Sequence, residues 1–193
     1  MKLPIFILTI LLLIIAYFPY WRGMFKQVIH PHPLTWLSWA VVTLVLGLIY
    51  LFNEGGFQTW ISFLLVINNI AIVIASLALG QKVQITKIDI LCFITSLLAL
   101  IIWLVINQPV WSVVIITASQ LIAFIPSIRK AYHRPYDESA LTWGTHGFRY
   151  GLMTLLVATA SFTTLVNSIF WSVVYVSSAI FLLWRRKALS ISS

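Results

Sequence analysis

The sequence predicts an all-α membrane protein with seven transmembrane helices, arranged as two parallel three-helix bundles joined by a linker helix. Three observations predict this class: the composition, seven long apolar runs and an internal repeat. Of the 193 residues, 61% are hydrophobic and 8% are charged. Soluble domains average roughly 45–50% apolar residues and about 25% charged residues. This composition excludes an ordinary soluble domain and a disordered chain. It also excludes a nucleic-acid-binding domain, because the few basic residues lie between long apolar runs.

Seven hydrophobic runs supply the predicted helices, since about 20 apolar residues are needed for one helix that crosses a bilayer. The runs are long and continuous rather than short and alternating, which favours helices over transmembrane strands. They leave only short connections and no separate soluble domain. The predicted helices cover Leu3–Trp21, Leu34–Phe52, Phe57–Leu79, Ile88–Ile106, Val110–Ile128, Ser139–Ser161 and Ser168–Trp184.

Each boundary between the runs has a local signal. The first run follows Lys2 and shows no small-residue cleavage site before Arg22, so we expect a retained helix rather than a signal peptide. The last boundary, from Ser161 to Asn167, is only weakly polar and is the least distinct. The other boundaries contain charged, polar, glycine or proline residues and are Arg22–Pro33, Asn53–Gly56, Gly80–Lys87, Asn107–Pro109 and Arg129–Glu138.

The basic residues predict the orientation of the helices. With seven helices, Lys2 lies on the side of the N-terminus, whereas ten of the 12 lysines and arginines lie on the opposite side. An excess of basic residues marks the cytoplasmic side. We therefore expect a multi-pass protein of the cell membrane with its N-terminus outside and its C-terminus in the cytoplasm. The ten residues are Arg22, Lys26, Lys82, Lys87, Arg129, Lys130, Arg134, Arg185, Arg186 and Lys187.

An internal repeat appears when the chain is aligned with itself at an offset of 107 residues. It divides the chain into a first three-helix unit (1–80), a linker helix (81–108) and a second three-helix unit (109–193). The first and fifth helices run in the same direction, so the units are predicted to be parallel and related by an axis along the membrane normal. Seven identities within 22 positions carry the repeat: Ile15/Ile122, Ala16/Ala123, Pro19/Pro126, Arg22/Arg129, Leu34/Leu141, Thr35/Thr142 and Trp36/Trp143.

Two repeated segments and one loop carry a family resemblance. The segments are Pro19-Tyr20-Trp21-Arg22 with Leu34-Thr35-Trp36, and Pro126-Ser127-Ile128-Arg129 with Leu141-Thr142-Trp143; the loop is Arg134-Pro135-Tyr136-Asp137-Glu138-Ser139. Together with the three-plus-one-plus-three layout, they resemble the SWEET/PQ-loop (MtN3-like) superfamily. The resemblance implies this fold and solute transport; relatives include sugar carriers, lysosomal amino-acid carriers and a receptor that transports nothing. Tyr20 and Ser127 stand where the family has glutamine.

Arg149 is the one basic residue that lies inside a predicted span. It is ten residues into the sixth run, roughly 15 Å along a helix, where a charge costs at least about 2.5–3.5 kcal/mol. No acidic residue lies at that depth in the sequence, so we expect Arg149 to bind a solute that carries a carboxylate or phosphate. The alternative is a structural role, in which Arg149 bonds helix-end carbonyls, Asn69 or Gln120.

The sixth run has two distinct faces at helical spacing. A polar face is formed by Thr142, His146, Arg149 and Met153, which fall within about 60° of one another. The opposite face contains Ala140, Gly144, Gly147 and Gly151 and permits close packing of a neighbouring helix. His146 could relay protons or bond the substrate.

Further candidate substrate-binding residues come from other runs. Asn69 lies on a polar stripe of the third run, and the family resemblance implies substrate contact by an asparagine on that helix. A helix-packing role for Asn69 remains the alternative. Tyr175 lies on a polar and aromatic face of the seventh run, where no mid-depth asparagine is expected. The complete candidate set is Arg149, His146, Asn69, Trp39, Thr142, Gln120 and Tyr175.

Pro19 and Pro126 are candidate hinges at an inner gate. Each removes a backbone hydrogen bond within an apolar helix and can kink it. The alternative is that each proline simply ends its helix before the basic loop.

These features predict a facilitator-type transporter of a small polar or anionic solute. A non-transporting receptor of the same fold, binding a carboxylate-bearing ligand, is the alternative. The expected partners are a small-molecule solute and the lipid bilayer, with no nucleic acid; a homo-oligomer is left open. No hydrolytic, redox or metal-ligand pattern occurs, so neither an enzyme nor a cofactor nor a metal site is expected.

Overall fold

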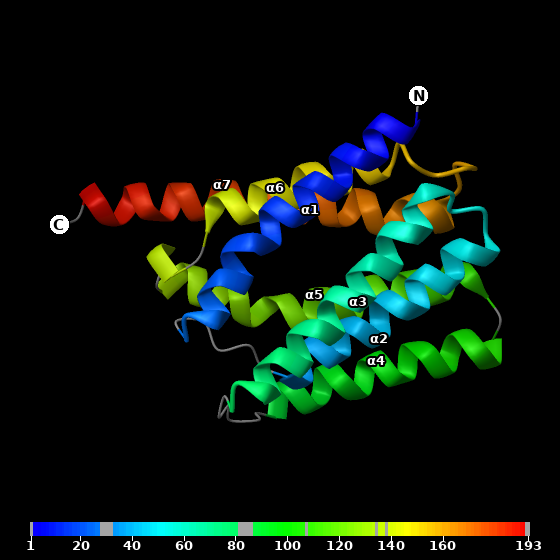
Figure 1. Ribbon diagram of the computed structural model, residues 1–193, viewed down its shortest axis with the longest axis horizontal. Helices are drawn as coiled ribbons and strands as arrows, with labels where there is room; N and C mark the ends of the chain where they lie inside the picture. Colours follow the sequence, from blue (N-terminus) through cyan, green and yellow to red (C-terminus); the bar gives the residue numbers. More distant parts are fainter. Residues whose placement is uncertain are drawn as a thin grey trace.

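A computed structural model describes residues 2–27, 33–80, 87–106, 108–133, 135–137 and 139–191, without several side chains, most of them in the fourth and fifth helices. These residues form seven α-helices and one short 3-10 helix (Figure 1). The predicted bounds of the first five helices agree with the structure to within one residue, except that the first ends at Phe25 rather than Trp21 and the fifth at His133 rather than Ile128. The elements are α1 (Lys2–Phe25), α2 (Pro33–Phe52), α3 (Phe57–Ala78), α4 (Lys87–Ile106), α5 (Pro109–His133), η1 (Pro135–Asp137), α6 (Ala140–Met153) and α7 (Phe162–Ile191).

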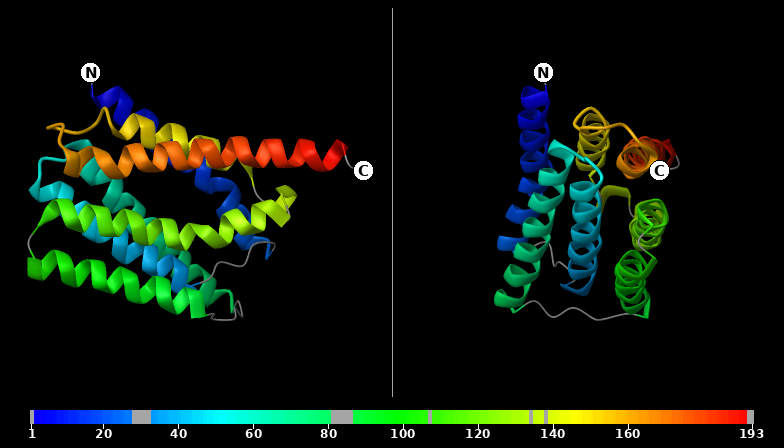
Figure 2. Two further views of the ribbon diagram at one scale, coloured as in Figure 1. Left: turned by 180° about the vertical axis from the view of Figure 1, so that it is seen from behind. Right: turned by 90° about the vertical axis from the view of Figure 1, so that its right-hand side faces the viewer.

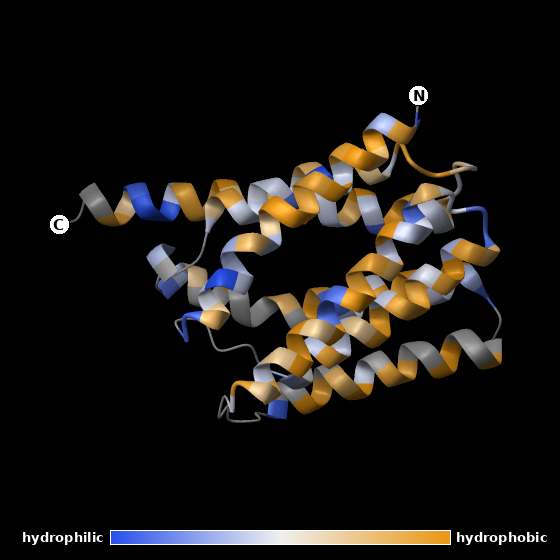
Figure 3. Ribbon diagram, in the orientation of Figure 1, coloured by the Kyte–Doolittle hydropathy of each residue, from blue (hydrophilic) through white to orange (hydrophobic). Residues whose placement is uncertain are grey.

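The helices run back and forth between two ends of the molecule. The start of α1 lies at the same end as the C-terminal ends of α2, α4 and α6, and the end of α7 lies at the other (Figures 1 and 2). Hydrophobic residues cover most of the length of α1, α2 and α3 (Figure 3). Within the described residues, three helices are long and apolar enough to cross a membrane: Lys2–Phe25, Phe57–Ala78 and Phe162–Leu189. They are compatible with a membrane protein.

The helices other than α4 form a ring of neighbours. Helix α3 packs against α1 and α2, and α7 packs against α5 and α6. The ring closes because α1 contacts α6 and α2 contacts α5. Helix α4 contacts α2 and α5 and lies at the edge opposite α6 and α7 (Figure 2).

The predicted bounds of the sixth and seventh helices are wrong. Helix α6 ends at Met153 and α7 begins at Phe162, so their connection is Thr154–Ser161 rather than Ser161–Asn167. The connection escaped prediction because it is apolar; Leu156 is fully buried within it. The start of α7 is fixed by reciprocal bonds: Thr164 N donates to Ser161 Oγ over 3.2 Å, and Ser161 N donates to Thr164 Oγ1 over 3.0 Å. This pattern resembles a capping box.

The connection between α6 and α7 is bound to the first half of the chain. Its Ala158 and Thr159 amides both donate to the carbonyl of Glu54 over 3.2 Å, and the Thr159 hydroxyl donates to the Glu54 carboxylate. Just after the connection, the carbonyl of Thr164 in α7 accepts from the side-chain Nε2 of Gln58 over 2.8 Å. Lys2 donates from its ammonium to the carbonyl of Val157. We name the contact between Glu54 and residues 158–159 the Glu54 latch.

The glycine face of α6 packs against α7, as predicted. A Cβ atom added to Gly147 would lie 2.7 Å from Val176 Cγ2 and 2.9 Å from the Val176 backbone nitrogen. The Ser172 hydroxyl donates to the Gly147 carbonyl over 2.9 Å. This close approach requires a residue without a side chain at position 147.

Gly147→Ala is expected to destabilise the protein, whereas Gly144→Ala is not. The added methyl group at 147 would force α6 and α7 apart, at a cost of about 1–3 kcal/mol in the free energy of unfolding. A Cβ atom at Gly144 meets only Ala179 Cβ at 4.0 Å, and alanine has the higher helix propensity by about 0.8–1.0 kcal/mol. Thermal unfolding of the two purified variants measures the difference. Equal stability would show that α6 and α7 are not in such close contact.

Candidate functional site

Arg149 lies just before the last turn of α6 and is almost fully buried, with 1% of its surface exposed. Its Nη1 atom donates to the Met153 sulfur over 3.1 Å, and its Cζ atom lies 4.2 Å from the centre of the Tyr150 ring. Its Nε atom is buried and has no hydrogen-bond partner in the part of the chain that the structure describes. Glu54 is the one acidic residue whose side chain the structure describes, and it belongs to the latch. Arg149 therefore has no acidic partner among the described residues.

The two contacts of Arg149 hold a cation only weakly. A thioether is a weak acceptor, and a cation over an aromatic ring gains about 0.5–2 kcal/mol. Removing a charge from water costs far more unless strong partners replace the water. Arg149 is thus positioned by soft contacts while its capacity to bind an anion stays largely unused.

His146 lies one turn before Arg149 and connects α6 with two other helices. Its ring centre lies 5.2 Å from that of Tyr17 on α1 and 5.4 Å from that of Tyr175 on α7. The imidazole is 8% exposed, and its Nδ1 atom is buried without a partner. Two polar groups of one helix face, at His146 and Arg149, therefore lack partners in the same region.

Aromatic rings surround these two side chains. Tyr175 stacks on Tyr150 with ring centres 5.8 Å apart and contacts Trp171 at 5.2 Å. Trp171 in turn faces Trp39 of α2 at 6.2 Å. The rings come from α1, α2, α6 and α7, and hence from both predicted three-helix units. We call this set the aromatic cluster: Tyr17, Trp39, His146, Tyr150, Trp171 and Tyr175.

Gln120 joins the cluster through Trp171 rather than through Arg149. Its Oε1 atom accepts from Trp171 Nε1 over 2.6 Å and from Asn167 Nδ2 over 3.0 Å. Asn167 also donates to Thr117 Oγ1 over 2.9 Å. All three polar side chains are buried. This network ties α5 to α7, and the bond from Arg149 to Gln120 considered as a structural role is not formed.

Asn69 and Thr142 are placed differently from the rest of the predicted set. Asn69 is 1% exposed in α3, and its Oδ1 atom has no partner; it does not bond Arg149. Thr142 is in the first turn of α6, where its amide donates to the N-cap Ser139 over 3.2 Å. Thr142 is two helical turns from Arg149. The structure therefore brings together Arg149, His146, Trp39, Tyr175 and Gln120 of the seven candidates.

Neither candidate hinge proline ends its helix. Pro19 lies inside α1, which continues to Phe25. Helix α5 likewise continues past position 126 to His133, although the Pro126 side chain is outside the described part of the structure. A proline inside a helix leaves the carbonyl one turn earlier without its usual donor. The alternative that Pro19 simply ends its helix is therefore wrong.

Sequence reasoning missed Tyr17, Tyr150 and Asn167. The two tyrosines lie in apolar runs, where periodicity alone does not separate a site residue from a core residue. Asn167 was assigned to a connection but lies in α7 and is 1% exposed. The Ser161 and Thr164 pair, spaced as in a capping box, is the signal that would have placed Asn167 inside the helix.

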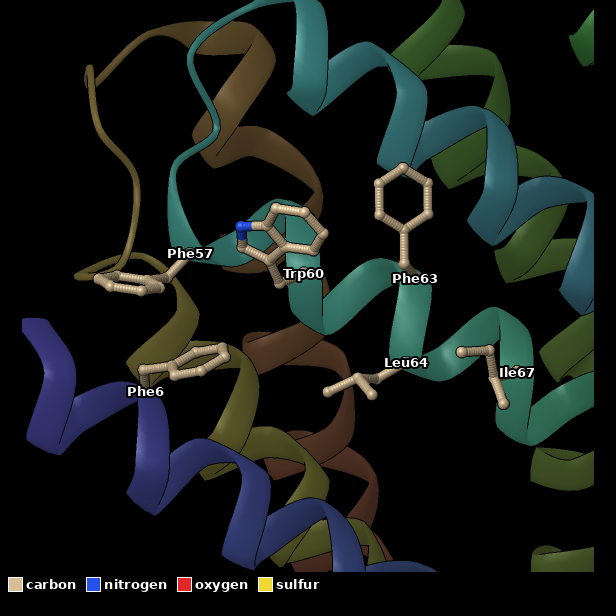
Figure 4. A pocket seen from close by; sticks show the side chains of 6 residues that line it. All are labelled: Phe6, Phe57, Trp60, Phe63, Leu64 and Ile67. Atoms are coloured by element: carbon tan, nitrogen blue, oxygen red, sulfur yellow. The ribbon is translucent and has the colours of Figure 1, made fainter.

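A separate groove lies between α1 and α3 and has a different character. It is lined by Phe6 of α1 and by Phe57, Trp60, Phe63, Leu64 and Ile67 of α3, with a volume of about 460 Å³ (Figure 4). Phe6 and Phe57 stack with ring centres 4.8 Å apart. The lining is apolar and includes none of the candidate substrate-binding residues. Such a groove suits contact with lipid chains better than binding of a polar solute.

Comparison with known proteins adds no relative to this description. No family model, no curated protein and no solved structure matches the chain. The functional argument therefore depends on the buried arginine, the imidazole beside it and the rings around them.

Proposed function

We propose that this protein is a multi-pass membrane transporter of the facilitator type, which moves a small polar or anionic solute by alternating access between two three-helix units. The fold proposed is that of the SWEET/PQ-loop superfamily, with α4 as the linker. The observation that carries the proposal is Arg149, a cation that is 1% exposed and has no acidic partner in the described residues, between the two units.

The pattern of helix neighbours supports two related units. The offset of 107 residues places the first residue of α1 on that of α5, and the first residue of α2 on that of α6. The contacts of α3 with α1 and α2 then correspond to those of α7 with α5 and α6. Two contacts join the units: α1 with α6, and α2 with α5. Because α1 corresponds to α5 and α2 to α6, these two contacts are equivalent. A twofold axis along the helix direction is the simplest arrangement with these properties.

The distribution of charge supports an N-terminus outside the cell. Arg22 is in the last turn of α1 and Lys87 is the first residue of α4, both at the end where α7 also terminates. Arg185 lies near that end of α7. Lys2 lies at the opposite end. The basic end is therefore assigned to the cytoplasm.

Uptake of solutes by proteoliposomes tests the proposal. The wild-type protein is expected to accumulate one class of labelled solute in a screen of carboxylates, phosphate, amino acids and sugars. Arg149→Gln is expected to reduce that uptake about 10-fold or more, because a charged hydrogen bond contributes about 1.5–3 kcal/mol. Arg149→Lys keeps the charge but not the planar fork and is expected to show an intermediate loss.

Arg185→Gln is the matched control for this experiment. Arg185 also lies over a tyrosine ring, with Cζ 4.3 Å from the centre of Tyr132, but it is outside the aromatic cluster. Its substitution is expected to leave uptake unchanged. Equal uptake by folded wild-type and Arg149→Gln protein would contradict the binding role. Binding of a carboxylate without any uptake would instead indicate a receptor of the same fold.

A further inference from the structure

The charge of the aromatic cluster limits the charge of its ligand. In the described part of the chain, Arg149 is the one lysine or arginine in contact with the aromatic cluster, through the Tyr150 ring. The other described basic side chains lie toward the ends of the helices, as with Arg22, Lys87 and Arg185. A buried group with one positive charge compensates one negative charge, and a second negative charge would remain unpaired at a high cost. A monovalent anion therefore fits this site better than a phosphate dianion.

The free polar atoms indicate how such an anion is held. Arg149 Nε and His146 Nδ1 are both buried without partners. The two residues are three positions apart on α6 and therefore lie on the same face. A carboxylate has two oxygens that can accept from a guanidinium and from an imidazole N–H at once. With the His146 proton on Nδ1, one carboxylate can accept a hydrogen bond from each of the two residues.

The rings around the pair indicate the shape of the rest of the ligand. Tyr17, Tyr150, Trp171 and Tyr175 belong to a packed cluster with ring contacts of 5.2 to 6.5 Å, so a ligand body that enters here replaces some of these ring contacts. Aromatic rings prefer offset-stacked or edge-to-face contact with other flat groups. A sugar would need several hydrogen-bonding groups, but Gln120 Oε1 already accepts two hydrogen bonds and Asn167 donates to two acceptors.

We infer that the ligand is a monovalent anion with a flat, apolar body, such as an aromatic carboxylate, whose carboxylate binds Arg149 and His146 and whose body lies among the rings of the aromatic cluster. This inference deepens the proposed function, on which it rests for the ligand's route to the site. Neither phosphate nor a neutral sugar belongs to the inferred class.

Calorimetric titration of the purified protein in nanodiscs tests the ligand class without any transport step. Benzoate is the flat monoanion, cyclohexanecarboxylate has the same charge without the flat ring, and inorganic phosphate and glucose are the other probes. Benzoate is expected to bind at least about fivefold more tightly than cyclohexanecarboxylate, with no measurable binding of phosphate or glucose. Comparable binding of cyclohexanecarboxylate, tighter binding of phosphate or glucose, or no binding of benzoate would overturn the inference.

Two variants test the assigned contacts. Arg149→Gln is expected to weaken benzoate binding at least about 30-fold, and His146→Phe, which keeps a ring at this position, several-fold; Arg185→Gln is the control and should bind like wild type. Circular dichroism confirms that each variant is folded. Benzoate affinity that Arg149→Gln leaves unchanged would overturn the assignment. Benzoate binding without uptake of any solute would contradict transport but support this ligand class. Uptake of another solute without benzoate binding would support transport but contradict this ligand class.

Discussion

Arg149→Met is expected to abolish uptake and at the same time to raise the free energy of unfolding by about 1–3 kcal/mol. Methionine keeps the length and much of the apolar volume of the side chain while removing a buried charge. In the folded protein, the contacts of this charge with the described residues are those to the Met153 sulfur and the Tyr150 ring. Unpaired buried charges reduce stability, and an apolar replacement of similar volume removes that cost. A gain in stability with a loss of function is the signature of a binding residue.

Gln120→Leu provides the contrast to this variant. Gln120 Oε1 accepts hydrogen bonds from Asn167 and Trp171. Its loss would leave the buried Trp171 Nε1 without this acceptor, while Asn167 would keep its bond to Thr117. An unsatisfied buried donor costs about 1–3 kcal/mol, and we expect Gln120→Leu to lower the free energy of unfolding by at least that amount. Thermal unfolding of both variants in the same detergent measures the two changes in stability, which are expected to have opposite signs. Destabilisation of Arg149→Met to the extent of Gln120→Leu would assign Arg149 a structural role.

Helix positions could be predicted wherever the polarity of the chain changes sharply. The end of α2 is predicted because Asn53, Glu54 and two glycines follow it, and the start of α5 because Pro109 begins it. The end of α6 had no such signal. Leu155, Leu156 and Val157 continue the apolar run, and they leave the helix because the chain there binds Glu54 of the first half. A partner distant in the sequence decides this boundary, so no local pattern contains it.

The candidate site was predictable to the extent that one helix determines it. Helical periodicity alone places Gly147 and Arg149 on opposite faces of α6, and the structure packs Gly147 against Val176. The residues that surround Arg149 come from other helices. Tyr17 contacts His146 only because α1 and α6 are neighbours. Which rings of a chain with 15% aromatic residues meet in the centre depends on the crossing of helices, which composition does not specify.

Cross-linking residues 54 and 159 is expected to stop uptake almost completely. Alternating access requires the two units to separate at each end in turn, and the Glu54 latch joins them at the end where α1 begins. Glu54→Cys and Thr159→Cys are introduced together with Cys92→Ser to remove the single native cysteine. A short bis-methanethiosulfonate reagent can join them, since it forms a reducible disulfide with each cysteine and releases methanesulfinate. The bridge would hold this end closed, and the solute could therefore no longer enter from that side. Reduction of the bridge should restore uptake.

The same reagent applied within one unit separates this effect from general rigidity. Tyr132 and Arg185 lie next to each other, since Arg185 Nε donates to the Tyr132 carbonyl over 3.0 Å, and both belong to the second unit. Cysteines at these two positions are expected to be cross-linked without loss of uptake, because alternating access moves the units as bodies. Full uptake with residues 54 and 159 joined would show that the units do not part at this end. The Glu54 latch would then be a permanent connection, and the solute would have to reach Arg149 by another route.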